Sequence, residues 1–447
     1  MKFMALGLGV VALLGGAAAE TAVRVDALDK LEAALRGVRA GATVVLTGGE
    51  YPTKQAVRIE GVRGTETAPI VLRAEQRGRA VIGGAAGFVL KDCEHLVVEG
   101  FRFTHDADQP ALLLDNCRHV RVTRNRFRPT ERTKPRRMEH WVYALGAHSR
   151  SNRIDHNLFE RKVNSGSPVF VRGDDATLVC SQHDRIDHNH FRDVVFANGA
   201  NGHETIRTGG NDLGASGRSS FTVIEDNLLE RCSGEGEVMS LKSSDNIVRR
   251  NTLLNCRGAI CLRLGNRTEV SGNCVLADAD APGCGGVKLY GFDHRVFSNY
   301  FRGLTGQKHE APLALVPGIF AAPTTMEIGR QYKDLTTVPP TRAWIAHNTW
   351  EDCAPLQFGF KKDKERKFIP TDCTFISNTV VRTTPGRAPL LNMELIRDFQ
   401  ARDNRALGCG AAPTNAWAGW FRFEELGARP LPEVHPLTPK EVGPDAP

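Results

Sequence analysis

Thr222-Val223-Ile224-Glu225-Asp226-Asn227-Leu228-Leu229 joins a short strand-like segment to an asparagine that has an apolar residue two places further on. A short segment of β-branched and apolar residues ahead of polar turn residues predicts a strand that ends at the asparagine. The same tag recurs along the chain, so the segment indicates a repeat rather than an isolated strand. The nine tags begin at Asn125, Asn157, Asn189, Asn227, Asn251, Asn273, Asn299, Asn348 and Asn378.

The spacing of these tags predicts the architecture. Successive asparagines are 32, 32, 38, 24, 22, 26, 49 and 30 residues apart, which indicates a unit of about 22 to 26 residues with insertions. Short strands at such a period, without a helical pattern between them, are typical of a parallel β-helix whose coils stack at roughly 4.8 Å. At an inward turn, asparagine tolerates left-handed backbone and its amide can bond to the next coil. We therefore assign the nine asparagines to a structural ladder.

The two ends of the repeat predict a cap and a tail. Residues 26–36 place Leu28, Leu31 and Leu35 on one face of an amphipathic helix, which would cover the first coil. Strand-like segments at 43–46, 70–72 and 96–98 begin the winding, and the long gap at 306–340 predicts an excursion beside a groove. From residue 426 the chain is rich in proline and charge. The prediction is an all-β, single-domain parallel β-helix over 20–425 with an N-terminal helical cap, and an extended or disordered tail over 426–447.

The first 19 residues have the features of a signal peptide. Lys2 provides a basic start, residues 5–14 form an apolar run, and Ala17-Ala18-Ala19 offers a cleavage site. No later stretch approaches about 18 consecutive apolar residues, so we expect no membrane span. We expect the exported protein in the periplasm or the medium, as a monomer. The eleven cysteines lack metal-ligand spacing, and we expect most of them to be buried thiols.

The net charge allows an acidic partner. It is +7 for the chain and 7 − 1 = +6 once Lys2 is removed. This charge suits a polyanion, and in an exported protein we expect an acidic polysaccharide rather than a nucleic acid. Ordinary surface charge for solubility explains the same number, so the charge alone does not decide between the two.

Glu235-Gly236-Glu237-Val238-Met239-Ser240-Leu241-Lys242 concentrates charge in a strand-like run. Lys242 lies 9 residues before Asn251, Arg263 lies 10 before Asn273, and Lys288 lies 11 before Asn299. Three successive coils would thus carry a cation at nearly the same place. In a strand, alternate residues face opposite sides, so Met239 and Leu241 face the core and Lys242 faces outward. The pattern predicts a basic stripe with neighbours roughly 5 Å apart.

The two glutamates do not fit a straight strand. Glu235 and Glu237 share a parity with each other but not with Lys242, so a bend or bulge near Val238 is needed to bring them to the same side. Gly234 and Gly236 make such a bend easy. The structural alternative is that both glutamates only neutralise the basic stripe.

Five ordered motifs then resemble polysaccharide lyase family 6, which holds alginate lyases and chondroitinase B on right-handed parallel β-helices. The likeness is strongest between Asn201 and Tyr300. Many members have histidine after the second catalytic residue, where this chain has Leu264, and that difference bears on substrate contacts. The motifs are the segments 201–207, 227–237, 240–243, 262–266 and 285–288.

The resemblance implies a role for each matched residue. Lys242 corresponds to the general base and Arg263 to the proposed acid of a β-elimination. The implied calcium ligands are Asn201, Glu235 and Glu237. The implied or suspected substrate contacts are Arg207, Lys288, His203 and Glu204, the last of which can instead anchor Arg207.

The chemistry is consistent with those residue types. Elimination removes the C5 proton of a uronate and expels the oxygen on C4, and calcium with hard oxygen ligands stabilises the charge on the sugar carboxylate. Arginine is a weak acid, so Arg263 is expected to donate a proton or to stabilise the leaving oxygen.

Alginate is the leading substrate candidate, and chondroitin or dermatan sulfate is the second. A glycosidase using Glu235 and Glu237, or a β-helix that only binds carbohydrate, remain alternatives.

Overall fold

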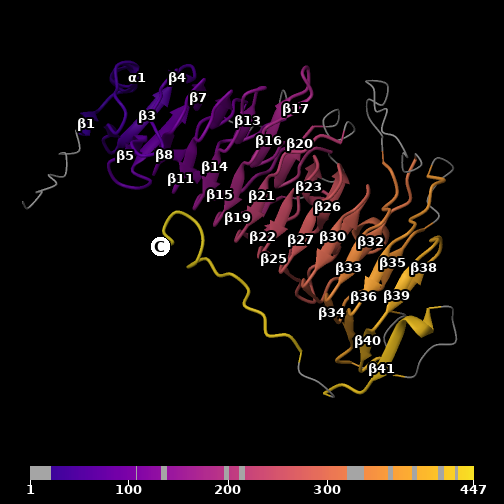
Figure 1. Ribbon diagram of the computed structural model, residues 1–447. Helices are drawn as coiled ribbons and strands as arrows, with labels where there is room; N and C mark the ends of the chain where they lie inside the picture. Colours follow the sequence, from indigo (N-terminus) through magenta and orange to yellow (C-terminus); the bar gives the residue numbers. More distant parts are fainter. Residues whose placement is uncertain are drawn as a thin grey trace, which may run out of the picture.

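The chain winds through three long parallel sheets that stack coil on coil into one elongated solenoid (Figure 1). The computed structural model describes residues 22–447 apart from 107, 132–137, 196–200, 211–216, 320–336, 361–365, 385–389, 411–416 and 428–430. Sheet 1 has 14 strands from β1 (Ala22–Val25) to β39 (Gln400–Arg402), and sheet 3 has 14 from β3 (Gly49–Thr53) to β41 (Phe421–Glu424). Sheet 2 has 13 strands. The predicted parallel β-helix is confirmed.

Sheet 2 carries the charged residues of the predicted site. Strand β17 (Val179–Cys180) pairs antiparallel with β16 and forms a hairpin at its edge. The other strands, in spatial order, are β4 (Val57–Glu60), β7 (Phe88–Lys91), β10 (Leu112–Asp115), β13 (Val142–Leu145), β16 (Val169–Asp174), β20 (Ile206–Gly209), β23 (Glu237–Lys242), β26 (Gly258–Leu264), β29 (Cys284–Leu289), β32 (Leu313–Leu315), β35 (Leu356–Phe358) and β38 (Leu391–Met393).

The N-terminal cap and the core follow from the apolar pattern. Helix α1 (Leu28–Arg36) buries Leu31 and Leu35 completely or nearly so, which confirms the predicted cap. Inward side chains of the three sheets form one continuous apolar core, and like residues stack along the axis. The rings of Phe127 and Phe159, for example, are stacked with centroids 4.7 Å apart. Ten of the eleven cysteines are buried, and all are unpaired thiols, as expected.

The asparagine ladder is confirmed at all nine positions. Each side-chain amide is buried and donates to the carboxamide oxygen of the asparagine in the next coil, as Asn189 does to Asn227 at 3.0 Å. The same oxygen accepts the backbone N–H of Asn189 at 3.0 Å. Asn378 donates in the same way to Asn404, which extends the ladder by one coil. That tenth position was missed because Ala406 stands where most tags have a larger apolar residue.

Loss of one rung is expected to destabilise the solenoid. Replacing Asn227 with alanine leaves the buried backbone N–H of Asn189 without its acceptor. It also removes the amide that donates to the carbonyls of Ile186 and Glu225. We expect the Asn227→Ala variant to lose about 3 kcal/mol in the free energy of unfolding, measured by urea denaturation. Asn392 is the control because it is an exposed asparagine in strand β38 with ordinary backbone. An Asn392→Ala variant that loses as much stability as Asn227→Ala would contradict the structural role of the ladder.

The gap at 306–340 is not a single excursion. It contains a 3-10 helix, η1 (Lys308–Glu310), and then β32, which adds an ordinary rung to sheet 2 between β29 and β35. The prediction was therefore wrong for this part, because a strand of three residues is too short to stand out in the sequence. Residues 320–336 of the gap lie outside the described residues, as does the predicted signal peptide.

The last residues run back along the solenoid toward its N-terminal half (Figure 1). The backbone N–H of Leu437 donates to the Thr252 hydroxyl at 2.8 Å, and that of Gly443 donates to the carbonyl of His188 at 2.8 Å. Arg124 donates to the carbonyl oxygens of Pro444 and Ala446 at 3.2 and 2.6 Å. This C-terminal strap contacts coils that are not consecutive in the stack.

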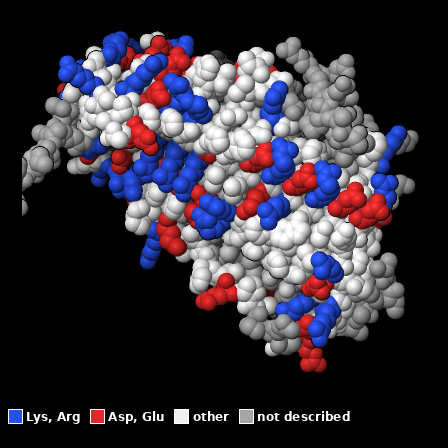
Figure 2. All heavy atoms as spheres, viewed as in Figure 1, with Lys and Arg blue, Asp and Glu red and all other residues white. Residues whose placement is uncertain are grey.

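Lysine and arginine are interleaved with aspartate and glutamate over much of the face shown in Figure 2. Such mixed surfaces are typical of solvated faces. None of the helices within the described ranges is long or apolar enough to cross a membrane.

Candidate active site

A bulge at Val238 brings the two glutamates to the outer side of sheet 2. Glu237 pairs with Ala259 of β26, whereas Met239 pairs with the next residue, Ile260, so Val238 is the extra residue. Both Val238 and Met239 are buried. The predicted bend near Val238 is confirmed. Glu237 therefore faces outward with Ser240, whose hydroxyl donates to it at 2.6 Å.

The loop before the bulge passes very close to the preceding coil. A Cβ atom on Gly234 would lie 2.2 Å from the carbonyl oxygen of His203, so only glycine fits there. The backbone N–H of Gly202 then donates to Glu235 at 2.9 Å. This close approach holds Glu235 beside the segment that leads into β20.

The basic stripe is not straight. Lys242 pairs with Leu264, and a second bulge places Arg263 next to it on the adjacent strand. Lys288, however, pairs with Cys261, two residues before Arg263. The prediction of a single line was wrong for Lys288, because counting back from the asparagine ignores differences in the length of the intervening turns. Lys288 instead shares a row across sheet 2 with Arg207, through Ser240 and Cys261.

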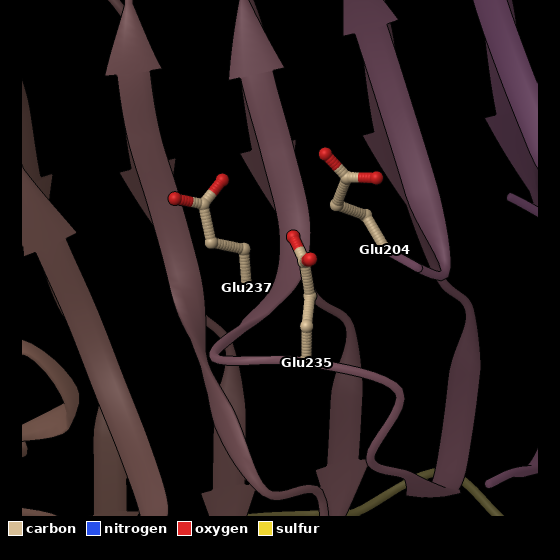
Figure 3. Close-up of side chains that lie close together, drawn as sticks. All are labelled: Glu204, Glu235 and Glu237. Atoms are coloured by element: carbon tan, nitrogen blue, oxygen red, sulfur yellow. The ribbon is translucent and has the colours of Figure 1, made fainter. Parts of the chain in front are cut away.

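Three carboxylates converge beside these cations (Figure 3). Glu204, Glu235 and Glu237 each bring one oxygen within 4.8 Å of the others. Glu204 comes from the segment before β20, Glu235 from the loop after β22 (Leu228–Cys232), and Glu237 from the start of β23. The sequence predicted two of these residues as metal ligands and Glu204 as a substrate contact; the structure groups Glu204 with the two acids.

The cations and the carboxylates form a network of ion pairs. Glu237 lies 3.4 Å from Arg263 and 3.7 Å from Lys288. Glu204 lies 3.5 Å from Lys242 and 3.9 Å from Arg207. Glu237 thus does neutralise the basic residues, as the structural alternative required, whereas no ion pair of this kind joins Glu235 to a described cation.

The surroundings separate the pKa values of the two glutamates. Burial raises the pKa of Glu235 to about 8, and the carboxylates of Glu204 and Glu237 add to the shift. Burial by itself would raise the pKa of Glu237, but attraction from Lys288 and Arg263 outweighs it and lowers the pKa to about 2. Once Glu235 is ionised, the cluster therefore carries a negative charge that no ion pair among the described residues offsets.

This cluster fits a hard divalent cation. Calcium takes several oxygen ligands, mostly carboxylates and carbonyls. Neither carboxylate oxygen of Glu204 accepts a hydrogen bond from a described residue, although both are buried. A cation among the three carboxylates would satisfy those oxygens and remove the repulsion that raises the pKa of Glu235. Asn201, the third ligand implied by the family resemblance, is exposed in the adjoining loop, next to Gly202.

His203 takes a different position from the other predicted residues. Its side chain is fully buried, so the structure presents no part of it to a substrate. Burial lowers the pKa of His203 to about 3, and the charge of Lys162 adds to the shift. The ring is therefore neutral, and its contribution is to pack the segment that carries Glu204.

Aromatic side chains that the sequence did not single out support the two arginines. The guanidinium of Arg207 lies 4.5 Å from the ring centre of Phe170, and that of Arg263 lies 5.3 Å from the ring centre of Tyr290. Phe170 pairs with Arg207 across β16 and β20. The place of Phe170 in the alternation of β16 was a usable signal, because its side chain faces outward whereas most apolar side chains face the core.

Comparisons with known proteins identify the family of the chain. The sequence profile of the chondroitinase B family matches residues 25–390. AlyGC, a PL6 family alginate lyase, is 27% identical with a TM-score of 0.77 over 91% of this chain. That alignment covers 53% of AlyGC, so the chain spans about half of its length.

Two further solved structures have the same fold. A mannuronic acid specific family 6 lyase from human gut microbiota is 23% identical over 91% of this chain and 92% of its own, with a TM-score of 0.73. The family 6 polysaccharide lyase Pedsa3628 from Pseudopedobacter saltans is 22% identical over 95% and 99%, with a TM-score of 0.69. No curated protein matches the chain. The chain therefore belongs to polysaccharide lyase family 6, the family of chondroitinase B.

Proposed function

We propose that the protein is a calcium-dependent lyase that cleaves a uronate polysaccharide by β-elimination, with alginate as the leading substrate. The observation that carries the proposal is the pairing of Lys242 and Arg263 on adjacent strands beside three converging carboxylates. Alginate is preferred because AlyGC, the similar protein at 27% identity, is an alginate lyase. Dermatan or chondroitin sulfate is the second candidate, because the matching family is that of chondroitinase B.

Glu204, Glu235 and Glu237 would hold the calcium ion, together with Asn201 from the adjoining loop. When bound, the ion supplies positive charge that stabilises the negative charge building up on the sugar carboxylate. The proximity of the three oxygens supports this assignment for the glutamates. Arg207 and Lys288, in one row across sheet 2, are placed to hold the acidic groups of the polymer on either side of β23 and β26.

Lys242 would take the C5 proton of the uronate. The C–H electrons form the double bond between C4 and C5, and the bond from C4 to the glycosidic oxygen breaks. Lys242 acts in its uncharged form, as a general base must. Its side chain is only 11% exposed, so little solvent competes for the proton.

Arg263 would stabilise the oxygen that leaves. Its guanidinium is held by Glu237 on one side and by the ring of Tyr290 on the other. The attraction of Glu237 raises the pKa of Arg263 despite burial, so the group remains charged. A permanently charged guanidinium donates hydrogen bonds to the departing oxygen, and water can then supply the proton.

A glycosidase is the rival enzyme, and one observation favours it. Two neighbouring carboxyl groups with pKa values of about 8 and about 2 resemble the acid and the base of a hydrolase. Glu237, however, is occupied by Arg263, Lys288 and Ser240, which leaves it poorly placed to attack a sugar.

The products distinguish the two enzymes. We expect incubation with polymannuronate, polyguluronate and dermatan sulfate to yield oligosaccharides with unsaturated ends that absorb ultraviolet light. New reducing ends without unsaturation would identify a hydrolase instead. The absence of any cleavage, together with retained polymer binding, would identify a carbohydrate-binding β-helix. We also propose that residues 1–19 direct the export of the protein to the periplasm or the medium, where such polymers are found.

A further inference from the structure

A second polar pocket lies outside the catalytic cluster, where β13 turns into β14 (Arg153–Asp155). It has a volume of about 220 Å³, and its lining includes Arg118, His148, Ser149, Arg150, Cys180 and Gln182. No carboxylate is among its lining residues in the described part of the chain. The wall on one side is the hairpin of β16 and β17, which interrupts the regular coil. The pocket is therefore a local addition to the solenoid rather than a gap between coils.

Polar residues of this pocket lie one above the other on successive coils of the β-helix. Arg118, Arg150 and Gln182 occupy successive parallel bridges, so their backbones are roughly 4.8 Å apart. Arg118 pairs with Glu94 at 3.0 Å. The guanidinium of Arg150 is exposed and has no ion pair with any residue that the structure describes. One positive charge at the mouth of the pocket is thus left unmatched.

The floor of the pocket is a satisfied polar network. The Ser181 hydroxyl donates to the buried carboxylate of Asp184 and lies 2.9 Å from the hydroxyl of Ser149. Asp184 accepts the backbone N–H of Asn152 at 2.8 Å as well. The buried carboxylate of Asp184 is therefore engaged by its own neighbours.

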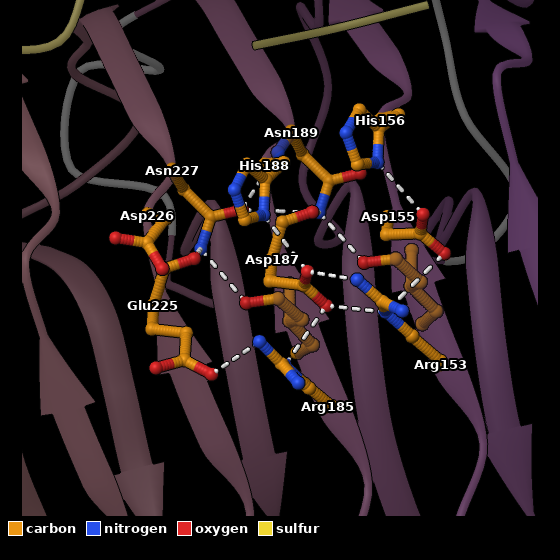
Figure 4. Close-up of polar contacts among 12 residues, drawn as sticks. Arg153, Asp155, His156, Arg185, Asp187, His188, Asn189, Glu225, Asp226 and Asn227 are labelled. Atoms are coloured by element: carbon orange, nitrogen blue, oxygen red, sulfur yellow. Dashed lines mark hydrogen bonds and ion pairs between the residues drawn. The ribbon is translucent and has the colours of Figure 1, made fainter. Parts of the chain in front are cut away.

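Arginines on the nearby outer face of sheet 1 behave differently. Arg153 pairs with Asp187 at 2.6 Å and Arg185 with Glu225 at 2.8 Å, and each of the two arginines also lies within ion-pair distance of a second carboxylate (Figure 4). These paired arginines would have to break short bonds before they could bind another anion. Arg150 would not, which distinguishes it from these paired arginines.

The pocket lies on the same side of the solenoid as the end of β23. Strand β13 ends at Leu145, just before the turn that lines the pocket, and β23 ends at Lys242. Three strand steps separate β13 from β23 in sheet 2, which corresponds to about 14 Å along the axis. A polymer several sugars long, bound at Lys242, can reach this distance.

We propose that this pocket is a remote subsite that binds a carboxylate of the polysaccharide chain held at the catalytic cluster. The planar fork of Arg150 matches a carboxylate, and His148 and Gln182 offer further polar contacts at the rim. The inference rests on the proposed function, since it takes a polyuronate as the ligand. It adds a contact beyond the residues matched to the family.

The test measures binding of alginate to protein that cannot cleave it. In a Lys242→Ala background, replacing Arg150 with alanine is expected to weaken alginate binding about tenfold, as loss of one charge-assisted hydrogen bond would. Arg150→Lys, which keeps the charge but not the fork, should recover part of the affinity. Arg402→Ala is the matched control, because Arg402 is an exposed arginine on distant β39.

Ligand length gives a second readout. A disaccharide is shorter than the separation of about 14 Å between the two places, so Arg150→Ala should weaken its binding much less than that of the polymer. Equal affinities of the Arg150→Ala and parent proteins for alginate would overturn the subsite, as would an equal loss for polymer and disaccharide. If the active protein cleaves no uronan, the proposed function fails, yet this binding comparison still decides whether the pocket takes a polyuronate.

Discussion

Replacing Lys242 with alanine should abolish the formation of unsaturated products, with a loss of about 10³-fold in kcat or more. Removal of a general base alone costs roughly 10² to 10⁴-fold. Lys242 is 3.5 Å from Glu204 and next to Arg263, and the described residues offer no second lysine at that end of β23. Initial rates of ultraviolet absorbance with the best uronan would measure the loss.

The design of that experiment separates loss of chemistry from loss of fold. Lys91 ends β7 of the same sheet and is exposed, so Lys91→Ala is a matched control that should keep full activity. Binding of the polymer to Lys242→Ala should persist, because Arg207, Lys288 and the carboxylate cluster are untouched. Activity of Lys242→Ala within tenfold of wild type would rule out Lys242 as the base.

Removal of calcium should inactivate the enzyme and lower its thermal stability. Exhaustive chelation is expected to reduce turnover by about 10² or more, and added calcium should restore it. Binding only the folded state stabilises a protein by about 2.7 kcal/mol when the ligand is at a hundred times its Kd. A Tm that does not change on adding calcium, together with full activity after chelation, would refute the metal assignment.

The same cluster predicts how stability without calcium depends on pH. The pKa of Glu235 is raised from 4.5 to about 8 in the folded state, so folding favours the protonated form. The stabilisation of the folded state by protonated Glu235 is fully present below pH 4.5 and is lost as the pH rises through about 8. The lowered pKa of Glu237 stabilises the folded state above pH 4.5, and this stabilisation is lost only as the pH falls below 4.5. Between pH 5 and 8 the Tm of the calcium-free protein should therefore fall, and calcium should reduce the fall.

Glu235→Gln provides the matched variant for this prediction. The change removes one negative charge while it keeps the size of the side chain. Without calcium, the variant should be at least as stable as wild type at pH 8, because the repulsion is gone. With calcium, it should gain less in Tm than wild type. A calcium response equal to that of wild type would show that Glu235 is not a ligand.

Local sequence was sufficient where one coil repeats the geometry of the next. The asparagine tags predicted the ladder because each amide meets the same atoms in the following coil, as Asn189 and Asn227 do. The parity of Glu237 and Lys242 predicted the bulge at Val238, since alternation in a strand is a property of the chain itself. The outward position of Lys242 and Arg263 follows from the same rule.

Sequence reasoning failed where the spacing between coils is irregular. Lys288 pairs with Cys261, two residues before Arg263, and so lies outside the predicted line. The grouping of Glu204 with Glu235 and Glu237 depends on a loop that meets the preceding coil. Strand β32 was missed within the long gap, and the path of the C-terminal strap had no local signal. In each case the contact joins residues that are far apart in the chain.

The sequence by itself determined the parallel β-helix, the asparagine ladder and the outward row that contains Lys242, because these features repeat within one coil and its neighbour. The tertiary structure alone decided which carboxylates converge, which aromatic rings support Arg207 and Arg263, and where the unmatched charge of Arg150 lies. The physical reason is that turns and insertions of unequal length set how far each coil is offset from the next. That offset depends on the lengths of many turns and insertions, so no single motif in the sequence determines it.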